Sequence, residues 1–392
     1  MADAPLKGIR VLEMARVLAG PWAGQLLADL GADVIKVENP DGGDETRQWG
    51  PPFLADASGE NLGAAYFHGT NRGKRSVTAD LRDKDDLAFV RRLAARSDVM
   101  IENFKTSGLK KYGLDYESLR KINPKLIYCS ITGFGQTGPY AGHAGYDFII
   151  QGMSGFMSVT GEPDGQPMKA GVAFADLFTG LYAVSAIQAA LIHVMKTGEG
   201  QHIDMALMDS QVAVLANQNM NFLATGKSPQ RLGNFHPNIS PYEVVPTLDG
   251  HLILAVGNDG QFARLCNLLD LEDLPSDPKF ATNPDRVANR KALHEHISAK
   301  TEFFERDDLL ARCEANAVPA GPINAIGEMF DDPQIQARGM RLDLDDGGGG
   351  TLPGVASPMK MSQTPPRHDR RAPRLGEHND EVRKELQRLE QS

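Results

Sequence analysis

The first half of the chain alternates short β-rich runs with helical patterns, and this alternation limits the possible folds more than any other feature. Residues 9–14 (IRVLEM) and 32–38 (ADVIKVE) are typical of strands, and residues 22–30 between them predict a helix. The same alternation continues with helices predicted over 84–96 and 116–122 and strands over 99–101 and 126–131. Because helical crossovers between parallel strands are right-handed, we predict an α/β fold in which helices cover both faces of a parallel sheet.

The second half begins with helices and then changes character. A long helix is predicted over 176–196 and a single helix over about 207–224. From Gly226 to residue 241 the chain is rich in Pro, Asn, Gly and Ser, and a β-hairpin with strands over 242–247 and 251–256 follows. We therefore expect a large domain built from two segments, 1–226 and 331–392, and a smaller α+β domain over 227–330 between them. The second segment of the large domain ends in a charged helix over 379–389.

Charge and cysteine content exclude several classes of function. The 392 residues carry 41 Lys and Arg against 51 Asp and Glu, a net charge of −10, so we expect no nucleic-acid partner, because phosphate contacts need a cationic face. Cys129, Cys266 and Cys313 form no CxxC pair, which favours a reducing compartment. The N-terminus lacks the apolar segment of a signal peptide, and we expect a cytoplasmic protein. Polar residues interrupt the apolar stretch 177–195, which predicts a buried helix and no membrane partner.

Residues 133–138 (GFGQTG) match the G-x-G-x-x-G pattern of dinucleotide-binding turns. That pattern also requires a helix that begins at the last glycine and an acidic residue at the end of the next strand. Pro139 follows the last glycine, and the next acids, Glu162 and Asp164, lie in a predicted loop. We therefore interpret the motif as a glycine-rich turn, with a NAD-dependent oxidoreductase as the less favoured alternative.

Two further segments carry groups that could hold a nucleotide. Residues 71–76 (NRGKRS) place Arg72, Lys74 and Arg75 together in an acidic protein. Cations around a glycine can wrap a phosphate, although a solvated turn would show the same pattern. Asn103 and Phe104 follow a predicted parallel strand, at the edge of the sheet where α/β proteins bind ligands, and they are candidates for holding a base.

Asp176 is the lone carboxylate in an apolar run, and it lies at the predicted start of a buried helix. It is interpreted either as the N-cap of that helix or as an ionised carboxylate that helix amides hold in apolar surroundings, which would make it a nucleophile. The two interpretations are compatible. His294 and His296 lack the i, i+4 spacing of helical metal ligands, and we predict no metal site.

Taken together, these residues resemble the family III CoA-transferases over nearly the whole chain. The resemblance rests on the order and spacing of short motifs, which are GIRVL at 8–12, AGP at 19–21, LGADVIKVE at 30–38, GDETR at 43–47, NRGKRS at 71–76, ENF at 102–104, GFGQTGP at 133–139, Asp176, TGEGQ at 197–201, VPAGP at 318–322 and LGEHN at 375–379. It implies a Rossmann-like large domain built from both ends of the chain, a smaller domain, and an interlocked homodimer.

The resemblance also implies an activity, the transfer of CoA from an acyl-CoA, for which we expect succinyl-CoA, to a small carboxylic acid. CoA is then a substrate, and no permanently bound cofactor is expected. In the family, an aspartate at the position of Asp176 attacks the thioester and carries first the acyl group and then CoA. Contacts with CoA are implied at Leu18, Ala19, Arg72, Lys74, Arg75, Asn103, Phe104 and Lys111. Tyr146 and Asp147 are expected to shape the substrate pocket beside Asp176.

Differences from named members of the fold narrow the expected reaction. Asn39 stands where formyl-CoA transferase has an arginine that contacts the base, and residues 233–241 replace the glycine-rich loop of that enzyme, so formyl-CoA and oxalate are not the expected substrates. α-Methylacyl-CoA racemase uses a Gly-His-Asp triplet, whereas this chain has Gly145-Tyr146-Asp147. A tyrosine with a pKa of ~10 is a poor base near neutral pH, which favours transfer over racemisation. A non-catalytic CoA-binding protein, which would not need Asp176, is the remaining alternative.

Overall fold

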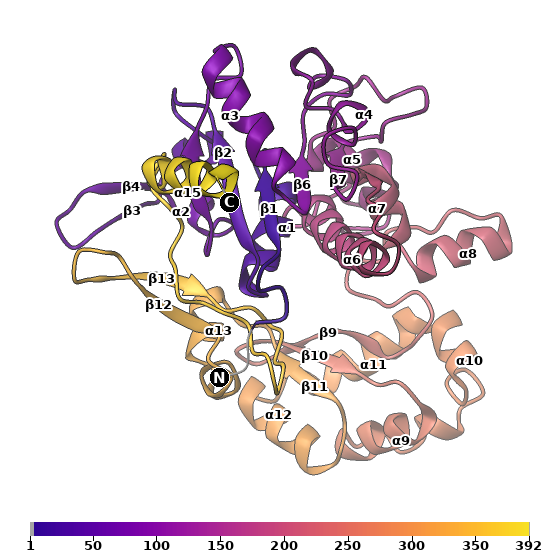
Figure 1. Cartoon of the computed structure of the whole chain (residues 1–392). Coiled ribbons are helices and arrows are strands. Elements are labelled where there is room, and N and C mark those ends of the chain that lie inside the picture. Colours follow the sequence, from indigo (N-terminus) through magenta and orange to yellow (C-terminus); the bar gives the residue numbers. More distant parts are fainter. Residues whose placement is uncertain (1–3, 392) are drawn as a thin grey trace. The chain divides into compact units, whose positions relative to one another are not determined.

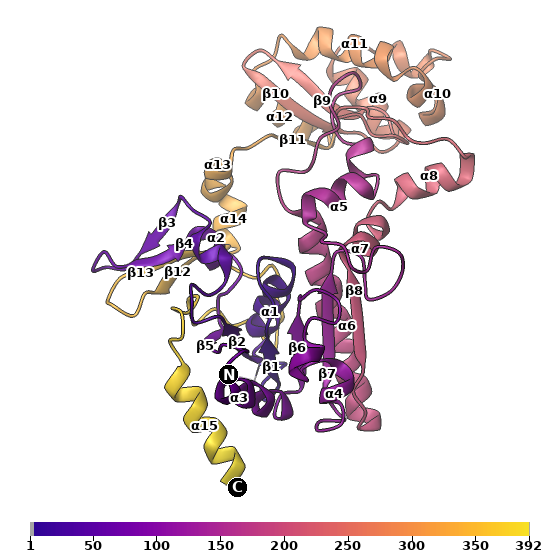
Figure 2. The ribbon, with the colours of Figure 1, turned by 90° about the horizontal axis from the view of Figure 1, so that it is seen from above.

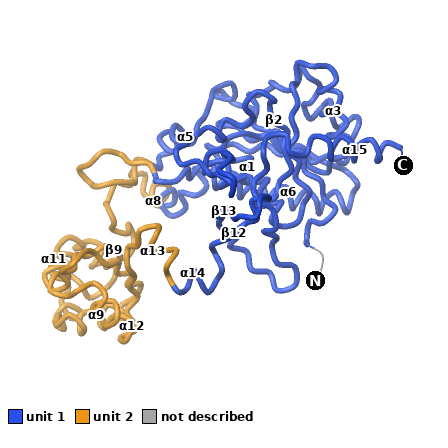
Figure 3. The backbone as a smooth tube through the Cα atoms, turned by 90° about the vertical axis from the view of Figure 1, so that its left-hand side faces the viewer, with its two compact units in different colours: residues 1–156, 170–220, 333–392 blue, residues 157–169, 221–332 orange. Residues whose placement is uncertain are grey.

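The computed structural model describes residues 4–391, which fall into two compact units (Figure 1 and Figure 3). The larger unit contains the residues up to 156, residues 170–220 and the residues from 333 onward, so both ends of the chain contribute to it. The smaller unit contains residues 157–169 and 221–332. The domain predicted over 227–330 corresponds to most of the smaller unit, but residues 157–169 were assigned to the large domain and belong instead to the smaller one.

A six-stranded parallel sheet forms the centre of the larger unit, as the alternation of patterns predicted. Its strands are β1 (Arg10–Glu13), β2 (Asp33–Glu38), β5 (Arg75–Thr78), β6 (Val99–Glu102), β7 (Ile127–Thr132) and β8 (His202–Ala206). They lie in the order β5-β2-β1-β6-β7-β8, and every neighbouring pair is parallel. The strand order reverses between β1 and β6. In such doubly wound sheets, ligands bind outside the carboxyl ends of the strands at this switch point.

Helices cover both faces of the sheet (Figure 1). They are α1 (Ala19–Asp29), α3 (Lys84–Ala95), α4 (Tyr116–Leu119), α5 (Asp147–Met153), α6 (Phe174–Thr197), α7 (Leu207–Ala213) and α15 (Asn379–Gln391). Successive side chains of a strand point to opposite faces, so Val11 of β1 packs in the cluster that contains α1 and α6, whereas Leu12 packs in the cluster that contains α3 and α15. The C-terminal helix α15 lies beside the edge strand β5 (Figure 2).

The helix α6 is the long apolar helix of the sequence, and it packs against α1, α5, α7, β7 and β8. Its close approach to α1 depends on Gly180, because a Cβ atom there would lie 2.8 Å from the Ala19 carbonyl oxygen and 2.9 Å from Cδ1 of Trp22. By length and composition alone α6 could cross a membrane. One side of α6 packs in the core of the larger unit, and 39% of its most apolar stretch is buried.

Residues 207–224 do not form the single helix that their pattern predicted. They form α7 and a separate helix α8 (Asn217–Thr225), because Ala216 adopts a left-handed conformation with φ of 45°. The side-chain amide of Asn219 donates a hydrogen bond of 2.6 Å to the Val212 carbonyl at the end of α7. This local contact satisfies a carbonyl that a continuous helix would have bonded internally, and no Gly or Pro marks the break in the sequence.

Short elements complete the larger unit and the boundaries between units. They are the hairpins β3 (Phe53–Ala55) with β4 (Asn61–Ala64) and β12 (Arg341–Asp345) with β13 (Thr351–Val355), the helices α2 (Ala65–His68) and α14 (Pro333–Ala337), and the 3₁₀ turns η1 (Glu45–Gln48), η2 (Lys110–Tyr112) and η3 (Phe156–Ser158).

The smaller unit has its own core and is of the α+β type. Its antiparallel sheet has the order β11 (Ala320–Pro322), β10 (Gly250–Ala255) and β9 (Tyr242–Thr247), which confirms the predicted hairpin. The surrounding helices are α9 (Asp259–Leu268), η4 (Leu274–Ser276), α10 (Asn283–Ala288), α11 (Arg290–Thr301), α12 (Arg306–Ala315) and α13 (Ile326–Asp331). Leu252, Phe262 and Leu293 are fully buried between these layers.

Candidate functional site

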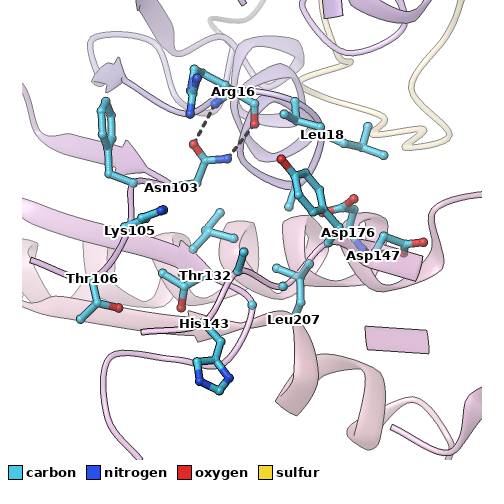
Figure 4. Close-up of a pocket in the computed structure, with 18 of the residues that line it drawn as sticks. Arg16, Leu18, Asn103, Lys105, Thr106, Thr132, His143, Asp147, Asp176 and Leu207 are labelled. Atoms are coloured by element: carbon cyan, nitrogen blue, oxygen red, sulfur yellow. Dashed lines mark hydrogen bonds between the residues drawn. The ribbon is translucent and has the colours of Figure 1, made fainter. Parts of the chain in front are cut away.

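A pocket opens at the carboxyl ends of β1, β6 and β7, which is the switch point of the sheet (Figure 4). It encloses about 220 Å³. Its walls are residues 16–19 after β1, 103–106 after β6, 131–133 at the end of β7, 141–147 leading into α5, and the side chains of Asp176 and Leu207. The pocket lies entirely within the larger unit.

The loops after the two central strands are joined into one wall by Asn103. The Arg16 N–H donates to Oδ1 of Asn103 at 2.9 Å, and Nδ2 of Asn103 donates to the Arg16 carbonyl at 2.7 Å (Figure 4). The guanidinium of Arg16 forms an ion pair with Glu45 and lies over the ring of Phe104, 5.9 Å from its centroid. Asn103 was predicted to hold a base, and the structure shows that half of its hydrogen-bonding capacity is already used on the backbone of Arg16.

One interpretation of the sequence made Asp176 the N-cap of α6, and the structure shows that this is wrong. The N-cap position is Ala173, which has no side chain able to cap, and Asp176 is the third helical residue. Asp147, the first residue of α5, accepts a hydrogen bond of 2.8 Å from the Ala175 N–H and so satisfies this helix end from another element. It is oriented by Gln151, whose Nε2 donates to Asp147 at 2.7 Å. The carboxylate of Asp176 is therefore free to face the pocket.

The environment of Asp176 raises its pKa to about 7. Burial is the largest cause, because it removes the water that stabilises the charged form, and the negative charge of Asp147 acts in the same direction. The Ala19 N–H donates a hydrogen bond to the carboxylate and partly offsets both effects. Ala19 is the first residue of α1, so the carboxylate lies at the positive end of that helix. Asp176 is thus a weakly solvated carboxylate that ionises near neutral pH, which suits a nucleophile.

Seven of the predicted site residues line this one pocket. They are Leu18, Ala19, Asn103, Phe104, Tyr146, Asp147 and Asp176.

The three cations of residues 71–76 do not point into this pocket, and the expectation that their side chains wrap a phosphate is corrected. Nη2 of Arg72 lies 2.7 Å from a carboxylate oxygen of Asp29, Nζ of Lys74 lies 2.8 Å from Glu13, and Arg75 pairs with acids of β2 and α15. All three side chains are buried. A buried cation without a partner is very costly, so each is neutralised by an acid from a distant part of the sequence.

Lys111 also lies outside the pocket lining. It is exposed in η2, and its Nζ lies 4.7 Å from the centroid of the Tyr112 ring. Its contact with CoA stays a prediction.

Sequence reasoning missed several groups at the site. Arg16 and Lys105 line the pocket, and each lies within four residues of the end of a predicted strand at the switch point, which is the signal that could have found them. His143 also lines the pocket, but its ring points away from Asp176 (Figure 4). Tyr66 of α2 lies near the two carboxylates, since burial and the charges of Asp176 and Asp147 raise the pKa of Tyr66 to about 12.

The glycine motif after β7 is a turn, as interpreted from the sequence. The chain after Gly133 runs through bends and turns, and the next helix begins only at Asp147. Gly133 is needed because a Cβ atom there would lie 2.5 Å from Cα of Gly145, where two segments of this loop cross. The requirements of a dinucleotide-binding turn are not met.

Known proteins resemble the chain over its whole length. The family model described as CoA-transferase family III matches residues 6–379. The succinate–glutarate CoA-transferase of Agrobacterium fabrum is 68% identical over 388 residues, which cover 99% of this chain and 97% of that protein. The succinyl-CoA:glutarate CoA-transferase of Homo sapiens is 42% identical over 391 residues, which cover 98% and 87%. A solved structure of a CAIB/BAIF family protein from Brucella suis has a TM-score of 0.88 and 58% identity, covering 98% of this chain and 100% of that one.

Proposed function

Because the chain belongs to CoA-transferase family III, we propose that Asp176 carries CoA between an acyl-CoA donor and a carboxylic acid acceptor in this transferase. The observation that carries the proposal is the position of Asp176, a half-buried carboxylate with a pKa of about 7 at the switch-point pocket. Relatives at 68% and 42% identity are named for succinate or succinyl-CoA and for glutarate, which supports succinyl-CoA as the donor and glutarate as the acceptor.

The reaction proceeds through covalent intermediates on Asp176. A carboxylate oxygen of Asp176 attacks the thioester carbonyl of succinyl-CoA, the C–S bond breaks, and a mixed anhydride and CoA thiolate result. The thiolate attacks the Asp176 carbonyl of the anhydride, which releases succinate and leaves an aspartyl-CoA thioester. Glutarate attacks this thioester to form a second anhydride, and the thiolate then attacks its glutaryl carbonyl. Glutaryl-CoA leaves, Asp176 is free again, and no net proton is consumed.

The walls of the pocket serve this relay in two ways. Each anhydride or thioester on Asp176 would hydrolyse if water reached it, and the burial that raises the pKa of Asp176 also limits access of water. Whenever CoA thiolate attacks the Asp176 carbonyl, negative charge develops on its oxygen. The Ala19 N–H, which donates to the carboxylate in the resting site, is placed to donate to that oxygen at the positive end of α1.

We place CoA along the segments after β1 and β6. Leu18, Ala19, Asn103 and Phe104 form the pocket wall that its reactive end would contact. Its phosphates need accessible cations, and the side chains of residues 72–75 are taken by internal acids. The lysines at 105, 110 and 111, all exposed on the segment after β6, supply positive charge in a protein whose net charge is −10. Tyr146 and Asp147 complete the pocket beside Asp176.

We do not propose racemisation. Tyr146 stands where a racemase would carry the histidine base, and the imidazole that does line the pocket, that of His143, points away from Asp176 (Figure 4).

We propose that the enzyme works as a homodimer, interlocked as in the family. Large apolar side chains on α5 and α6 that remain 44–76% exposed in a single copy support this. They are Phe148, Ile149, Met153, Leu181, Tyr182, Ile192 and Met195. Exposed apolar side chains along two helices that pack together are typical of a surface that another protein covers. Light scattering after size exclusion is expected to give twice the chain mass of 42.5 kDa, and a monomeric mass for the active enzyme would contradict the proposal.

We also propose a cytoplasmic location. The three cysteines are free and buried, which suits a compartment that keeps thiols reduced.

The covalent step can be tested by mass spectrometry. After incubation with succinyl-CoA, a peptide containing Asp176 is expected to carry CoA as a thioester that hydroxylamine removes. The Asp176→Ala variant is expected to form no adduct and to lose transfer by at least ~10³-fold, because the nucleophile is absent. Transfer at the wild-type rate by Asp176→Ala would refute the mechanism. An adduct on another residue would refute the assignment of Asp176.

A further inference from the structure

The loop between β1 and α1 is held in a strained conformation next to the nucleophile. Val17 has a φ of 72°, a left-handed conformation that a β-branched residue adopts only at a cost. Val17 lines the pocket, and two residues further on the Ala19 N–H donates to the carboxylate of Asp176. A relaxed backbone at Val17 would turn that N–H in another direction. Something in the surrounding structure must therefore hold the turn.

Two buried charged side chains make the contacts that hold it. Both carboxylate oxygens of Asp44 lie 3.3 Å from the Val17 nitrogen and accept its N–H. Nζ of Lys36 lies 2.9 Å from the Asp44 carboxylate and donates a hydrogen bond of 2.7 Å to the Ala15 carbonyl. The side chains of Asp44 and Lys36 have no exposed surface. The N–H of the strained residue and the carbonyl two residues before it are thus bound to one ion pair.

The same buried network reaches the other end of the loop. Glu13 accepts from Nζ of Lys36 at 3.0 Å and from Nζ of Lys74 at 2.9 Å. Lys74 in turn donates to the Pro21 carbonyl at 2.8 Å and to Asn71 at 2.9 Å. The backbone is therefore bound by a lysine on either side of the strained turn, and one carboxylate joins the two lysines.

We propose that Asp44 and Lys36 are positioning residues, which fix the left-handed turn at Val17 so that the Ala19 N–H meets Asp176, on the premise that Asp176 is the nucleophile proposed above. Neither group touches the substrate pocket, so neither is catalytic. Their action on the reaction passes through the backbone from Val17 to Ala19.

The charges around Lys36 and Asp44 keep these two groups ionised while Asp176 titrates, whereas burial lowers the pKa of Lys74 to about 8. Burial alone would lower the pKa of Lys36, but Glu13, Asp44 and Glu38 outweigh it and raise that pKa. Burial would raise the pKa of Asp44, but Lys36 and the amide of Thr46 lower it overall.

The groups that face Asp176 are the carboxylate of Asp147 and the phenol of Tyr66, whose pKa of about 12 keeps it neutral. The acidic limb near pH 7 therefore reports Asp176, whereas a change near pH 8 would report Lys74.

The test is the pH dependence of kcat/KM for CoA transfer from succinyl-CoA to glutarate in Asp44→Asn. Loss of the Ala19 hydrogen bond should raise the pKa of Asp176, so the acidic limb is expected to move to higher pH by about half to one unit. Hydrogen exchange of residues 16–21, followed by mass spectrometry, is expected to become faster. This second readout does not require activity, so it tests the positioning role even if Asp176 forms no CoA adduct and the proposed function fails.

A second substitution separates positioning from a general loss of stability. Glycine adopts a φ of +72° without strain, so Val17→Gly combined with Asp44→Asn is expected to return the acidic limb most of the way to its wild-type position. The matched control is Glu243→Gln in the smaller unit, which also neutralises a buried carboxylate, the partner of His294, and is expected to lower stability without moving the limb.

If Asp44→Asn does not fold, Val17→Pro breaks the turn directly, because proline fixes φ near −65°, and it is expected to give the same shift. An unchanged limb with unchanged exchange in a folded variant overturns the proposal. The proposal is also overturned if the acidic limb shifts in Asp44→Asn and adding Val17→Gly does not reduce that shift.

Discussion

Replacing Asp147 with asparagine separates the two effects that this residue has on the nucleophile. The carboxylate of Asp147 raises the pKa of Asp176 through its charge, and its Oδ1 caps α6 by accepting the Ala175 N–H at 2.8 Å. Asparagine removes the charge and keeps an oxygen for the cap. The new NH₂ group would face Nε2 of Gln151, which now donates to Asp147 at 2.7 Å, so we expect a loss of about 1 kcal/mol in stability.

The size of the expected shift follows from the site. The pKa of Asp176 stands at about 7 against an ordinary value of 3.8, so ionising it in the folded site costs roughly 4 kcal/mol more than in water. Burial accounts for the largest part and Asp147 for the next. Assigning about one unit to the charge of Asp147 moves the pKa to about 6 in Asp147→Asn. At pH 6 the ionised fraction then rises from about one tenth to one half, which is an increase of about fivefold.

The assay is kcat/KM for CoA transfer between pH 5 and 9, because this parameter reports the pKa values of the free enzyme. Wild type is expected to show an acidic limb near pH 7. Asp147→Asn is expected to show this limb about one pH unit lower, and the plateau value of kcat/KM should be smaller because the cap of α6 is weakened. Asp147→Ala is the control, since it removes the same charge and also the cap, and it should show the same limb with lower stability. A wild-type limb below pH 5, or a limb that moves to higher pH in Asp147→Asn, would refute the electrostatic reasoning.

Three further outcomes follow from the same geometry. The raised pKa of Asp176 means that the folded state resists ionisation of this group, so the free energy of unfolding should fall as the pH rises from about 4 to 7. Asp176→Asn should therefore be inactive, yet more stable than wild type at pH 8 by about 2 kcal/mol in urea unfolding. A less stable variant would contradict this. Gly180→Val should destabilise the larger unit by about 1–3 kcal/mol, because its Cβ would meet Ala19 and Trp22, and an unchanged midpoint in urea would count against this packing. Lys105→Ala should raise KM for succinyl-CoA several-fold without changing kcat, and the KM of the variant should depend less on salt concentration than that of wild type. An unchanged KM would show that Lys105 does not contact CoA.

Periodicity in the sequence was sufficient to predict the layers of the larger unit. Strands such as 32–38 and helices such as 84–96 show the spacing of buried side chains directly, and the structure has them within about two residues. The position of the pocket could also be inferred, because ligand-binding residues follow the strands of a doubly wound sheet. Asn103 and Phe104 were identified on that basis.

Partners of charged groups could not be predicted in the same way. The cluster at Arg72, Lys74 and Arg75 reads as a site for an anion, because the sequence shows the cations but not the acids that neutralise them. Those acids, Asp29 and Glu13 among them, lie tens of residues away and become neighbours only when the sheet forms. The capping of α6 by Asp147 of α5 could not be predicted for the same reason, because no residue at the N-terminus of α6 indicates that the cap comes from another helix.

Because Arg75 pairs with the last helix, the edge of the sheet gains part of its stability only when the end of the chain has been synthesised. Arg75 of β5 is buried against Glu381 and Glu385 of α15, which are made about 300 residues later. At ribosomal rates of about 5–20 residues per second, Arg75 has Asp33 of β2 as a partner but lacks the two carboxylates of α15 for roughly 15–60 s. The smaller unit is complete before α15 is synthesised, so it can fold while β5 still exposes an unpaired edge. Ribosome-bound chains truncated before residue 379 should therefore recruit chaperones at this edge, even though the nucleophile and its pocket loops have already been translated.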